Sequence, residues 1–280
     1  MESNWGRWGE DDERGAANLL SPTQVLRACG APTHGRIYDL GIEVRQGAPV
    51  VGRRMSPLHL MSVDGGDYAA LGREDSEGSA DDYLFMAVHG STHVDALSHV
   101  WSHGAMYNGF SYREVRSSGA SRCGIEKAGG MVTTAHVFDF RDAVGLDGNR
   151  IGSADFAKQA GERGIEVRPG DAVLVRTGWM ESNAAGVAAD ASPTVSPEAA
   201  EWFAECDVAV VGADNPAVED LNDVPLRLHR ALLRDRGVYL LELLDLQEVA
   251  ADEVSSGLLV LAPLRISRGV GSPVNPLLVV

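Results

Sequence analysis

The chain has 280 residues, 44% hydrophobic and 23% charged, and its 40 acidic and 24 basic side chains give a formal net charge of −16. A chain of this length can bury roughly three quarters of its unfolded surface, so it needs no disulfide support. The negative surface repels phosphate backbones and anionic lipids, and no apolar run approaches the ~20 residues of a membrane-spanning helix. Composition and charge therefore argue against nucleic acids and membranes as partners.

The cysteines and the N-terminus indicate a cytoplasmic protein. Cys29, Cys123 and Cys206 lie far apart, are odd in number and form no CxxC pair. This pattern argues against a disulfide framework and against a zinc–thiolate site. The N-terminal segment lacks the basic and apolar regions of a secretory signal. We therefore expect the protein in the reducing cytoplasm.

An aromatic segment and a helix are predicted at the start of the chain. Residues 1–20 contain Trp5 and Trp8 beside an acidic cluster. We expect these residues to form an N-terminal arm that packs on the domain, on a partner subunit or over a site. Ser21 followed by Pro22 predicts the beginning of a helix, because serine caps free N–H groups and proline fits the first turn.

A predicted strand at 36–44 is followed by a long segment, 47–82, rich in Gly, Ser and Asp. Long irregular stretches are unusual in compact domains and are typical of lids or binding loops. Residues 84–88 form a short apolar run, which we predict as a strand that leads into a histidine-rich segment.

Strands and helices are interspersed over the rest of the chain. The predicted strands are 132–140, 171–177, 208–211, 238–243 and 258–263. The predicted helices are 153–163 with Ser153 as its cap, 197–205 after a capping Ser196, and 226–236. Because the order is not a regular β-α-β rhythm, we expect an α/β or α+β fold with a mixed sheet curled toward a barrel and flanking helices. We expect residues 1–280 to form a single domain.

The candidate chemistry lies in the segment 89–99, which contains His89, His93, Asp95 and His99. Imidazole and carboxylate together suit Zn²⁺, Mn²⁺ or Fe²⁺. His93 and Asp95 are two residues apart, so they share one face of an extended strand. The segment therefore predicts a metal site.

The neighbouring residues allow these side chains to converge. The turn at 90–92 can fold His89 back toward His93. Asp95 and His99 are four residues apart and would share a face of a helix, with Thr92 as its cap. A lone histidine is more often a satisfied structural residue than a ligand, but four ligand-type side chains in one short segment favour metal binding. The pattern is not the HExxH of zinc proteases.

The segment resembles the H-x₃-H-x-D-x₃-H motif of the cyclase superfamily, which includes bacterial kynurenine formamidase, isatin hydrolase and several proteins of aromatic polyketide biosynthesis. The likeness continues at 8–20, 95–109, 175–179, 212–214 and 229–242. It covers nearly the whole chain and implies the swivelling β/α fold of that superfamily. Together with the N-terminal tryptophans, it also implies a homodimer or homotetramer.

The resemblance implies roles for single residues. His89, His93 and Asp95 would be metal ligands, and His99 would be the catalytic histidine or would orient a bound water. His229 and Glu242 resemble the residues that help to bind a second metal in kynurenine formamidase.

Three further residues leave alternatives open. Isatin hydrolase has a Gln ligand where this chain has Arg230, and an arginine cannot bind a metal, so the fourth ligand and the choice between one and two ions stay open. His103 follows His99 by four residues and would line the pocket if both lie on one helical face. Asp214 follows a predicted strand and is either a pocket residue or part of a turn.

These observations predict a hydrolase that depends on a divalent metal ion, Mn²⁺ or Zn²⁺, and acts on a small molecule. Metal-activated water would open a cyclic amide, imide or lactone, or cleave an N-formyl amide, with His99 or Asp95 moving the proton. No GxSxG motif suggests a serine nucleophile. The alternative in the same family is a polyketide-type cyclase that stabilises an enolate. A non-catalytic binding protein is a third alternative, which the complete motif disfavours.

Overall fold

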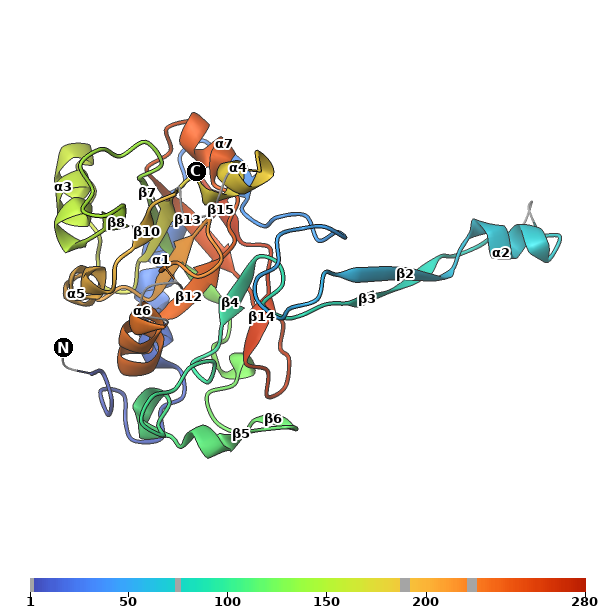
Figure 1. Ribbon diagram of the computed structural model, residues 1–280, viewed down its shortest axis with the longest axis horizontal. Coiled ribbons are helices and arrows are strands. Elements are labelled where there is room, and N and C mark those ends of the chain that lie inside the picture. The colour runs from blue at the N-terminus through green and yellow to red at the C-terminus, as the bar shows by residue number, and fades with distance from the viewer. Residues whose placement is uncertain (1–2, 74–76, 187–191, 221–225) are drawn as a thin grey trace.

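The computed structural model describes residues 3–73, 77–186, 192–220 and 226–280. A nine-stranded mixed sheet curls into a half-barrel with helices packed on it (Figure 1). Its strands, in spatial order, are β1 (Ile37–Asp39), β15 (Leu277–Val279), β13 (Ser256–Leu261), β7 (Met131–Asp139), β9 (Ala172–Arg176), β11 (Val210–Ala213), β12 (Tyr239–Glu242), β4 (His93–Asp95) and β14 (Gly271–Pro273). The expected fold class is confirmed.

The centre of the sheet is parallel and its two sides are antiparallel. Strands β7, β9, β11 and β12 run parallel, and their residues are buried on both faces almost throughout, as parallel strands require. Strands β13, β15 and β1 add on antiparallel at one side, and β4 and β14 at the other.

The helices are short and pack on the sheet. They are α1 (Pro22–Cys29), α3 (Ser153–Arg163), α4 (Trp179–Ala184), α5 (Ala200–Glu205), α6 (Arg227–His229), the π-helix η7 (Arg230–Arg236) and α7 (Gln247–Ala251). Single turns of 3₁₀-helix are η1 (Gly15–Leu19), η2 (Tyr107–Gly109), η3 (Tyr112–Glu114), η4 (Ile125–Lys127) and η6 (Pro197–Ala199). Phe138 of β7 meets Phe156 of α3 and Trp202 of α5 with ring centroids 5.5 and 5.6 Å away, which anchors these helices to the sheet.

Small hairpins and bridges complete the structure. They are the pairs β2 (Leu58–Val63) with β3 (Asp81–Phe85), β5 (Val115–Arg116) with β6 (Gly119–Ala120), and β8 (Arg150–Ile151) with β10 (Thr194–Val195). Among the described residues, no helix is long and apolar enough to cross a membrane.

The sequence-based prediction was wrong between residues 47 and 88. The segment expected to be irregular contains β2, the helix α2 (Gly65–Ala70) and the start of β3, which form a hairpin that projects from the body (Figure 1). The expected strand at 84–88 ends at Phe85, because Asp81–Phe85 pairs with β2 inside this hairpin and the chain then turns toward His89. The strand expected at 36–44 is limited to β1.

Two predicted caps differ as well. Ser21 caps α1 as expected, since its side chain accepts a hydrogen bond from the Gln24 amide. Ser153, however, is the first residue of α3, and its hydroxyl donates to the carbonyl of Glu198, while Gly152 occupies the cap position. Ser196 makes no side-chain cap, and its helix begins as the 3₁₀ turn η6.

The N-terminal arm packs on its own chain. Trp5 and Trp8 lie against the hydrophobic core, and the Trp5 indole donates to the Arg234 carbonyl at 2.8 Å. The sequence left open whether the arm packs on the domain, on a partner subunit or over a site. The structure shows the arm in contact with the domain.

Candidate metal centre

The candidate ligands come from one end of the sheet. His93 and Asp95 are the first and last residues of β4, where alternation along the strand puts both on one face, as predicted. The register of β4 with β12 places Glu242 opposite His93. His89 and His99 lie in turns that flank β4, and His229 ends α6. Secondary structure thus brings residues about 150 positions apart to one point.

The donor atoms lie close together around the Asp95 carboxylate. His89 Nε2 is 3.3 Å and His93 Nε2 is 3.6 Å from Asp95 Oδ1, and His229 Nε2 is 3.6 Å from Asp95 Oδ2. Glu242 joins them at 3.2 Å from both His93 Nε2 and His229 Nε2. Two groups, His89–Asp95–His99 and Asp95–His229–Glu242, each hold ligand atoms within 4.8 Å of one another.

Five of the donor atoms lack a hydrogen-bond partner in the part of the chain that the structure describes. His89 Nε2, His93 Nε2, both Asp95 oxygens and Glu242 Oε1 are buried and make no hydrogen bond among the described residues. Buried polar atoms are nearly always satisfied, so several such atoms aimed at one point require a ligand. Imidazole nitrogens with carboxylate oxygens are the donor set of Zn²⁺, Mn²⁺ and Fe²⁺. The residues present fit a divalent metal ion.

Two of the histidines are held so that Nε2 faces the cluster. His93 Nδ1 lies 2.7 Å from the Ser91 carbonyl, and His229 Nδ1 lies 2.6 Å from Glu219 Oε1. A carbonyl or carboxylate on Nδ1 holds the proton there and leaves Nε2 as a ligand atom, which is the usual arrangement around protein-bound metals.

The buried carboxylates and histidines of the cluster shift one another's pKa, because water does not reach them to screen their charges. Burial opposes ionisation of Asp95, but His99, His89 and His93 together hold the pKa of its carboxyl well below the usual range. Burial would also lower the pKa of His229, but Glu219, Glu242 and Asp95 raise it to about 10. In the absence of a cation, protons on His93 and His229 supply positive charge beside the carboxylates, since the neighbouring carboxylates raise the pKa of both histidines.

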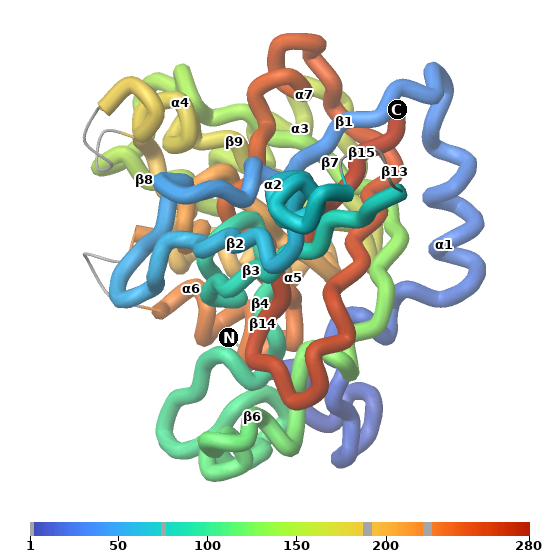
Figure 2. Tube along the Cα trace, turned by 90° about the vertical axis from the view of Figure 1, so that its right-hand side faces the viewer, coloured from blue at the N-terminus to red at the C-terminus, as the bar shows by residue number. Residues whose placement is uncertain are grey.

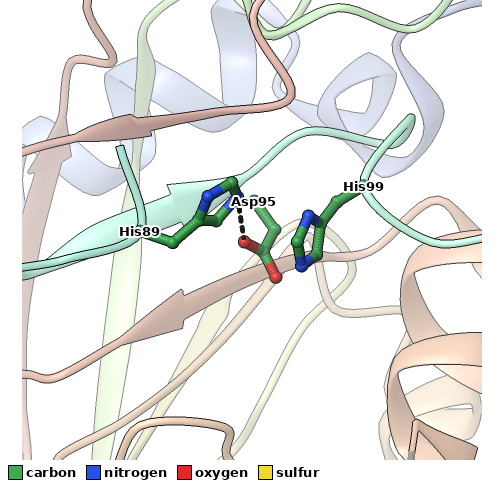
Figure 3. A group of neighbouring side chains, drawn as sticks. All are labelled: His89, Asp95 and His99. Carbon is green, nitrogen blue, oxygen red and sulfur yellow. Dashed lines mark ion pairs between the residues drawn. The ribbon is translucent and has the colours of Figure 1, made fainter. Parts of the chain in front are cut away.

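His99 differs from the other histidines. Its ring stacks on His89 with centroids 4.3 Å apart, and the two rings flank the Asp95 carboxylate (Figure 3). Burial lowers the pKa of His99 to about 4, with His89 and His229 adding to the effect and Asp95 opposing it. His99 is therefore a neutral base at pH 7. It is also half-buried, unlike His93 and Asp95.

The helix expected from Asp95 to His103 does not form, because residues 93–95 pair with β12 and β14 and the chain then enters a turn. Thr92 is not a helix cap: its hydroxyl accepts from the Ile42 amide at 2.8 Å and donates to the Leu243 carbonyl. His103 lies exposed in a turn with φ of 50° and belongs to neither ligand group. The structure does not bring it to the cluster.

Arg230 lies beside the cluster, next to His229. Its Nη1 donates to Ser102 Oγ at 3.5 Å, and its Nε is buried without a hydrogen-bond partner among the described residues. Arg230 places a positive charge near the turn that follows His99. It offers no ligand atom to a metal ion.

His136 and Asp214 have structural contacts. His136 Nε2 pairs with Asp171 at 3.0 Å, away from the cluster. Asp214 accepts hydrogen bonds from the Thr177 amide, the Thr177 hydroxyl and the Gly178 amide, and so joins the ends of β9 and β11.

Glu219 is the site residue that the sequence did not indicate. Besides His229 Nδ1, it accepts from the amides of His229 and Leu228 at 3.0 and 2.8 Å. Glu219 belongs to no recognisable motif. The sequence alone does not show whether a carboxylate is buried or lies on the surface.

Comparison with known proteins identifies the family of the chain. The sequence profile of the Cyclase family matches residues 38–220. The chain belongs to the Cyclase family. A crystal structure of a novel cyclase superposes with a TM-score of 0.91 at 33% identity and covers 100% of this chain and 98% of that chain.

Two characterised relatives of this cyclase-family chain are hydrolases. The isatin hydrolase of Roseibium aggregatum is 27% identical over 225 residues, which are 74% of this chain and 78% of that protein. The kynurenine formamidase of Bordetella petrii is 33% identical over 106 residues, 38% of this chain and 48% of that protein. At the level of the family, these relatives support an enzyme that hydrolyses amides.

Proposed function

We propose that the protein is a divalent-metal-dependent hydrolase that adds water to a cyclic amide, imide or lactone, or to an N-formyl amide, of a small molecule. One observation carries the proposal: five buried nitrogen and oxygen atoms converge without hydrogen-bond partners among the described residues. The hydrolytic activity of the two named relatives supports the reaction class.

His89, His93 and Asp95 would hold the metal ion, with His229 and Glu242 able to complete its coordination or to hold a second ion. A bound divalent cation of this kind polarises a carbonyl and lowers the pKa of a water molecule from about 15.7 toward 7. The Ser91 carbonyl and Glu219 keep the His93 and His229 rings in the orientation that metal binding requires.

We assign proton transfer to His99. Its imidazole is neutral at pH 7 and half-buried, so it can accept a proton from water and deliver it to the departing nitrogen or oxygen. Asp95 is the weaker candidate for this step, because its carboxylate is fully buried and its pKa is held far below neutrality. Asp95 would serve to hold the metal.

Hydrolysis is favoured over the polyketide-type cyclisation considered from the sequence, because both characterised relatives are hydrolases. The family fold alone fits either reaction. Transfer of ¹⁸O from labelled water into the product of an amide or lactone substrate would establish hydrolysis, since ring closure through an enolate takes up no water oxygen.

Elemental analysis of the purified chain tests the metal. We expect at least one transition-metal ion per chain after incubation with Mn²⁺ or Zn²⁺. His93→Ala removes a ligand and should lose most of the metal, whereas His34→Ala, at an exposed histidine, should keep it. An unmodified chain that binds neither metal would show that the cluster is structural.

Activity should follow metal content. A screen of cyclic amides, imides, lactones and N-formyl amines with the metal-loaded protein identifies the substrate, and chelation should abolish turnover. Full activity after thorough chelation would refute the mechanism. The choice between Mn²⁺ and Zn²⁺ and the cytoplasmic location stay predictions.

A further inference from the structure

Arg230 is a half-buried cation with no carboxylate partner in the described part of the chain. Its Nη1 donates to Ser102 Oγ at 3.5 Å, a long distance for a hydrogen bond, and its Nε is buried without a partner among the same residues. By contrast, Arg176 pairs with both Asp139 and Glu181. Because a charged group withdrawn from water is normally paired, Arg230 indicates an anion that comes from outside the chain.

The free donors of Arg230 lie on one edge of its guanidinium. The N–H group of Nε and one N–H group of Nη2 point in the same direction, and neither makes a hydrogen bond among the described residues. Two parallel donors match the two oxygens of a carboxylate, and such bidentate pairs are among the strong hydrogen bonds of proteins. Since Nε is covered in the structure, the side chain has to shift slightly to form both bonds.

The guanidinium lies close to the candidate metal centre. Arg230 directly follows His229, and its contact residue Ser102 comes three residues after His99, a stretch of chain that spans no more than roughly 11 Å. The rings of His99 and His229 have centroids 6.4 Å apart. The helix α6 lies beside β4 in both views of the molecule (Figures 1 and 2), which puts the start of η7 next to the turn after β4.

Arg230 is also on the side from which a small molecule reaches the cluster. In the two groups of ligand-type residues, His99 is the one that is not fully buried, so solvent approaches the cluster along His99. The guanidinium is held to the turn that His99 begins. A substrate that comes from solvent to the metal therefore passes beside both residues.

The helix that carries Arg230 changes its winding at this residue. Residues Arg227–His229 are α-helical, and Arg230–Arg236 form a π-helix. π-Helices are rare and occur frequently at functional sites. The change of winding is an observation independent of the missing partner, and it points to the same residue.

We propose that Arg230 binds a carboxylate of the substrate through Nε and Nη2 while the bond to be hydrolysed lies at the metal. This inference rests on the proposed hydrolase function and adds a substrate class: small amides, imides or lactones that carry a carboxylate within roughly 11 Å of that bond. The chain has a net charge of −16 and repels anions at long range, so such a substrate requires a specific cation at the site.

Titration calorimetry with a matched set of N-formyl anilines tests the proposal. The probes are ortho-, meta- and para-formamidobenzoate, whose rigid ring sets three distances between carboxylate and formamide, and neutral formanilide. We expect the purified chain to bind at least one isomer about 10- to 100-fold more tightly than formanilide, both before and after loading with Zn²⁺. Binding before loading excludes coordination of the carboxylate by the metal as the cause.

Substitution of the arginine should remove this preference. Arg230→Met should bind the isomers no more tightly than formanilide and leave formanilide binding unchanged, whereas Arg230→Lys should restore part of the preference, because it keeps the charge and loses the two-donor edge. Arg168→Met is the matched control, since Arg168 is exposed and pairs with Glu166 at 2.9 Å. The control should keep the full preference.

Metal content and stability separate this inference from the proposed function. Elemental analysis should find the same metal content in Arg230→Met as in the wild type, because arginine offers no ligand atom. Thermal unfolding should show no loss of stability, since the substitution removes an unpaired buried donor. A chain that binds no metal but keeps the arginine-dependent preference would refute the hydrolase and support the carboxylate site. A wild type without any preference, or a preference that survives in Arg230→Met, overturns the inference.

Discussion

At the scale of residues, the metal centre depends on groups that never touch the metal. Glu219 accepts three hydrogen bonds from the first turn that contains His229, including one from its ring, and so fixes both the helix end and the imidazole. The Ser91 carbonyl does the same for His93. The unpartnered ligand atoms are therefore in place before any cation binds.

Glu219→Gln should lower metal affinity by about 10- to 100-fold, since the amide keeps the shape of the side chain but loses the charge that fixes the His229 tautomer. Competition with a chelator of known affinity measures the change. Glu248→Gln is the matched control, because Glu248 is an exposed carboxylate that pairs with Arg36 far from the cluster. Equal affinity in the two variants would contradict the role of Glu219.

The raised pKa of the Asp214 carboxyl predicts that the free energy of unfolding depends on pH. Burial raises the pKa of its carboxyl to about 6, against the lowering effect of its hydrogen bonds from Thr177 and Gly178. The folded state therefore holds the proton more tightly than the unfolded state, whose pKa is about 3.8. The ionised carboxylate destabilises the fold above pH 6, and this destabilisation disappears as the pH falls toward 4.

Urea unfolding of the wild type and of Asp214→Asn between about pH 7.5 and pH 4.5 checks this expectation, because contributions from other groups cancel in the difference. The stability of the wild type relative to the variant should rise by ~2 kcal/mol as the pH falls over this range. A difference that is flat over this range would show that the three hydrogen bonds outweigh burial.

At the scale of elements, the pairing of β4 with β14 determines the position of His89. Gly271 pairs with Asp95, and a Cβ atom at Gly271 would lie 2.5 Å from His89 Nε2. Only a residue without a side chain allows the histidine to reach the carboxylate. This close approach is a reason for glycine that does not involve backbone strain.

Gly271→Ala should displace the His89 ring and reduce bound metal while the sheet still forms. Gly161→Ala in α3 is the control, since nothing lies within 4 Å of its added Cβ. It should raise the free energy of unfolding by about 0.5 kcal/mol without changing metal content. Elemental analysis and urea unfolding of both variants test the pair, and normal metal content in Gly271→Ala would contradict the argument.

At the scale of the whole molecule, the N-terminal arm holds distant parts of one chain together. Arg7 pairs with Asp207 at 2.6 Å, the Tyr107 hydroxyl donates to Asp12 at 2.8 Å, and Glu13 accepts from the Cys123 amide. Each contact joins the arm to a segment about 100 or more residues away. We therefore expect the arm to contribute to the stability of the single chain.

Deletion of residues 1–16 should lower the free energy of unfolding by at least ~3 kcal/mol, since it removes several of these hydrogen bonds and exposes the surface under Trp5. Thermal and urea unfolding of the truncated chain measure the loss. A truncated chain that is as stable as the full chain but smaller on sedimentation would instead place the arm at a contact between copies.

The sequence by itself determined what depends on neighbouring residues. Serine and proline at 21–22 predicted a helix start, the apolar runs predicted most central strands, and the two-residue spacing of His93 and Asp95 put both on one face, because these features follow from local backbone geometry. The hairpin of β2 and β3 was not predictable in this way, because its apolar residues lie on both faces of strands that lack a core.

Only the tertiary structure decided which distant groups meet. The register of β12 on β4 brings Glu242 to His93, and the packing of α6 brings His229 at its end, with its partner Glu219, to the same point. The same pairing excluded the helix that the spacing of Asp95 and His99 suggested. Local sequence patterns do not show which strands pair across some 150 residues. They also do not show which charged groups are buried away from water, because both are properties of the folded chain.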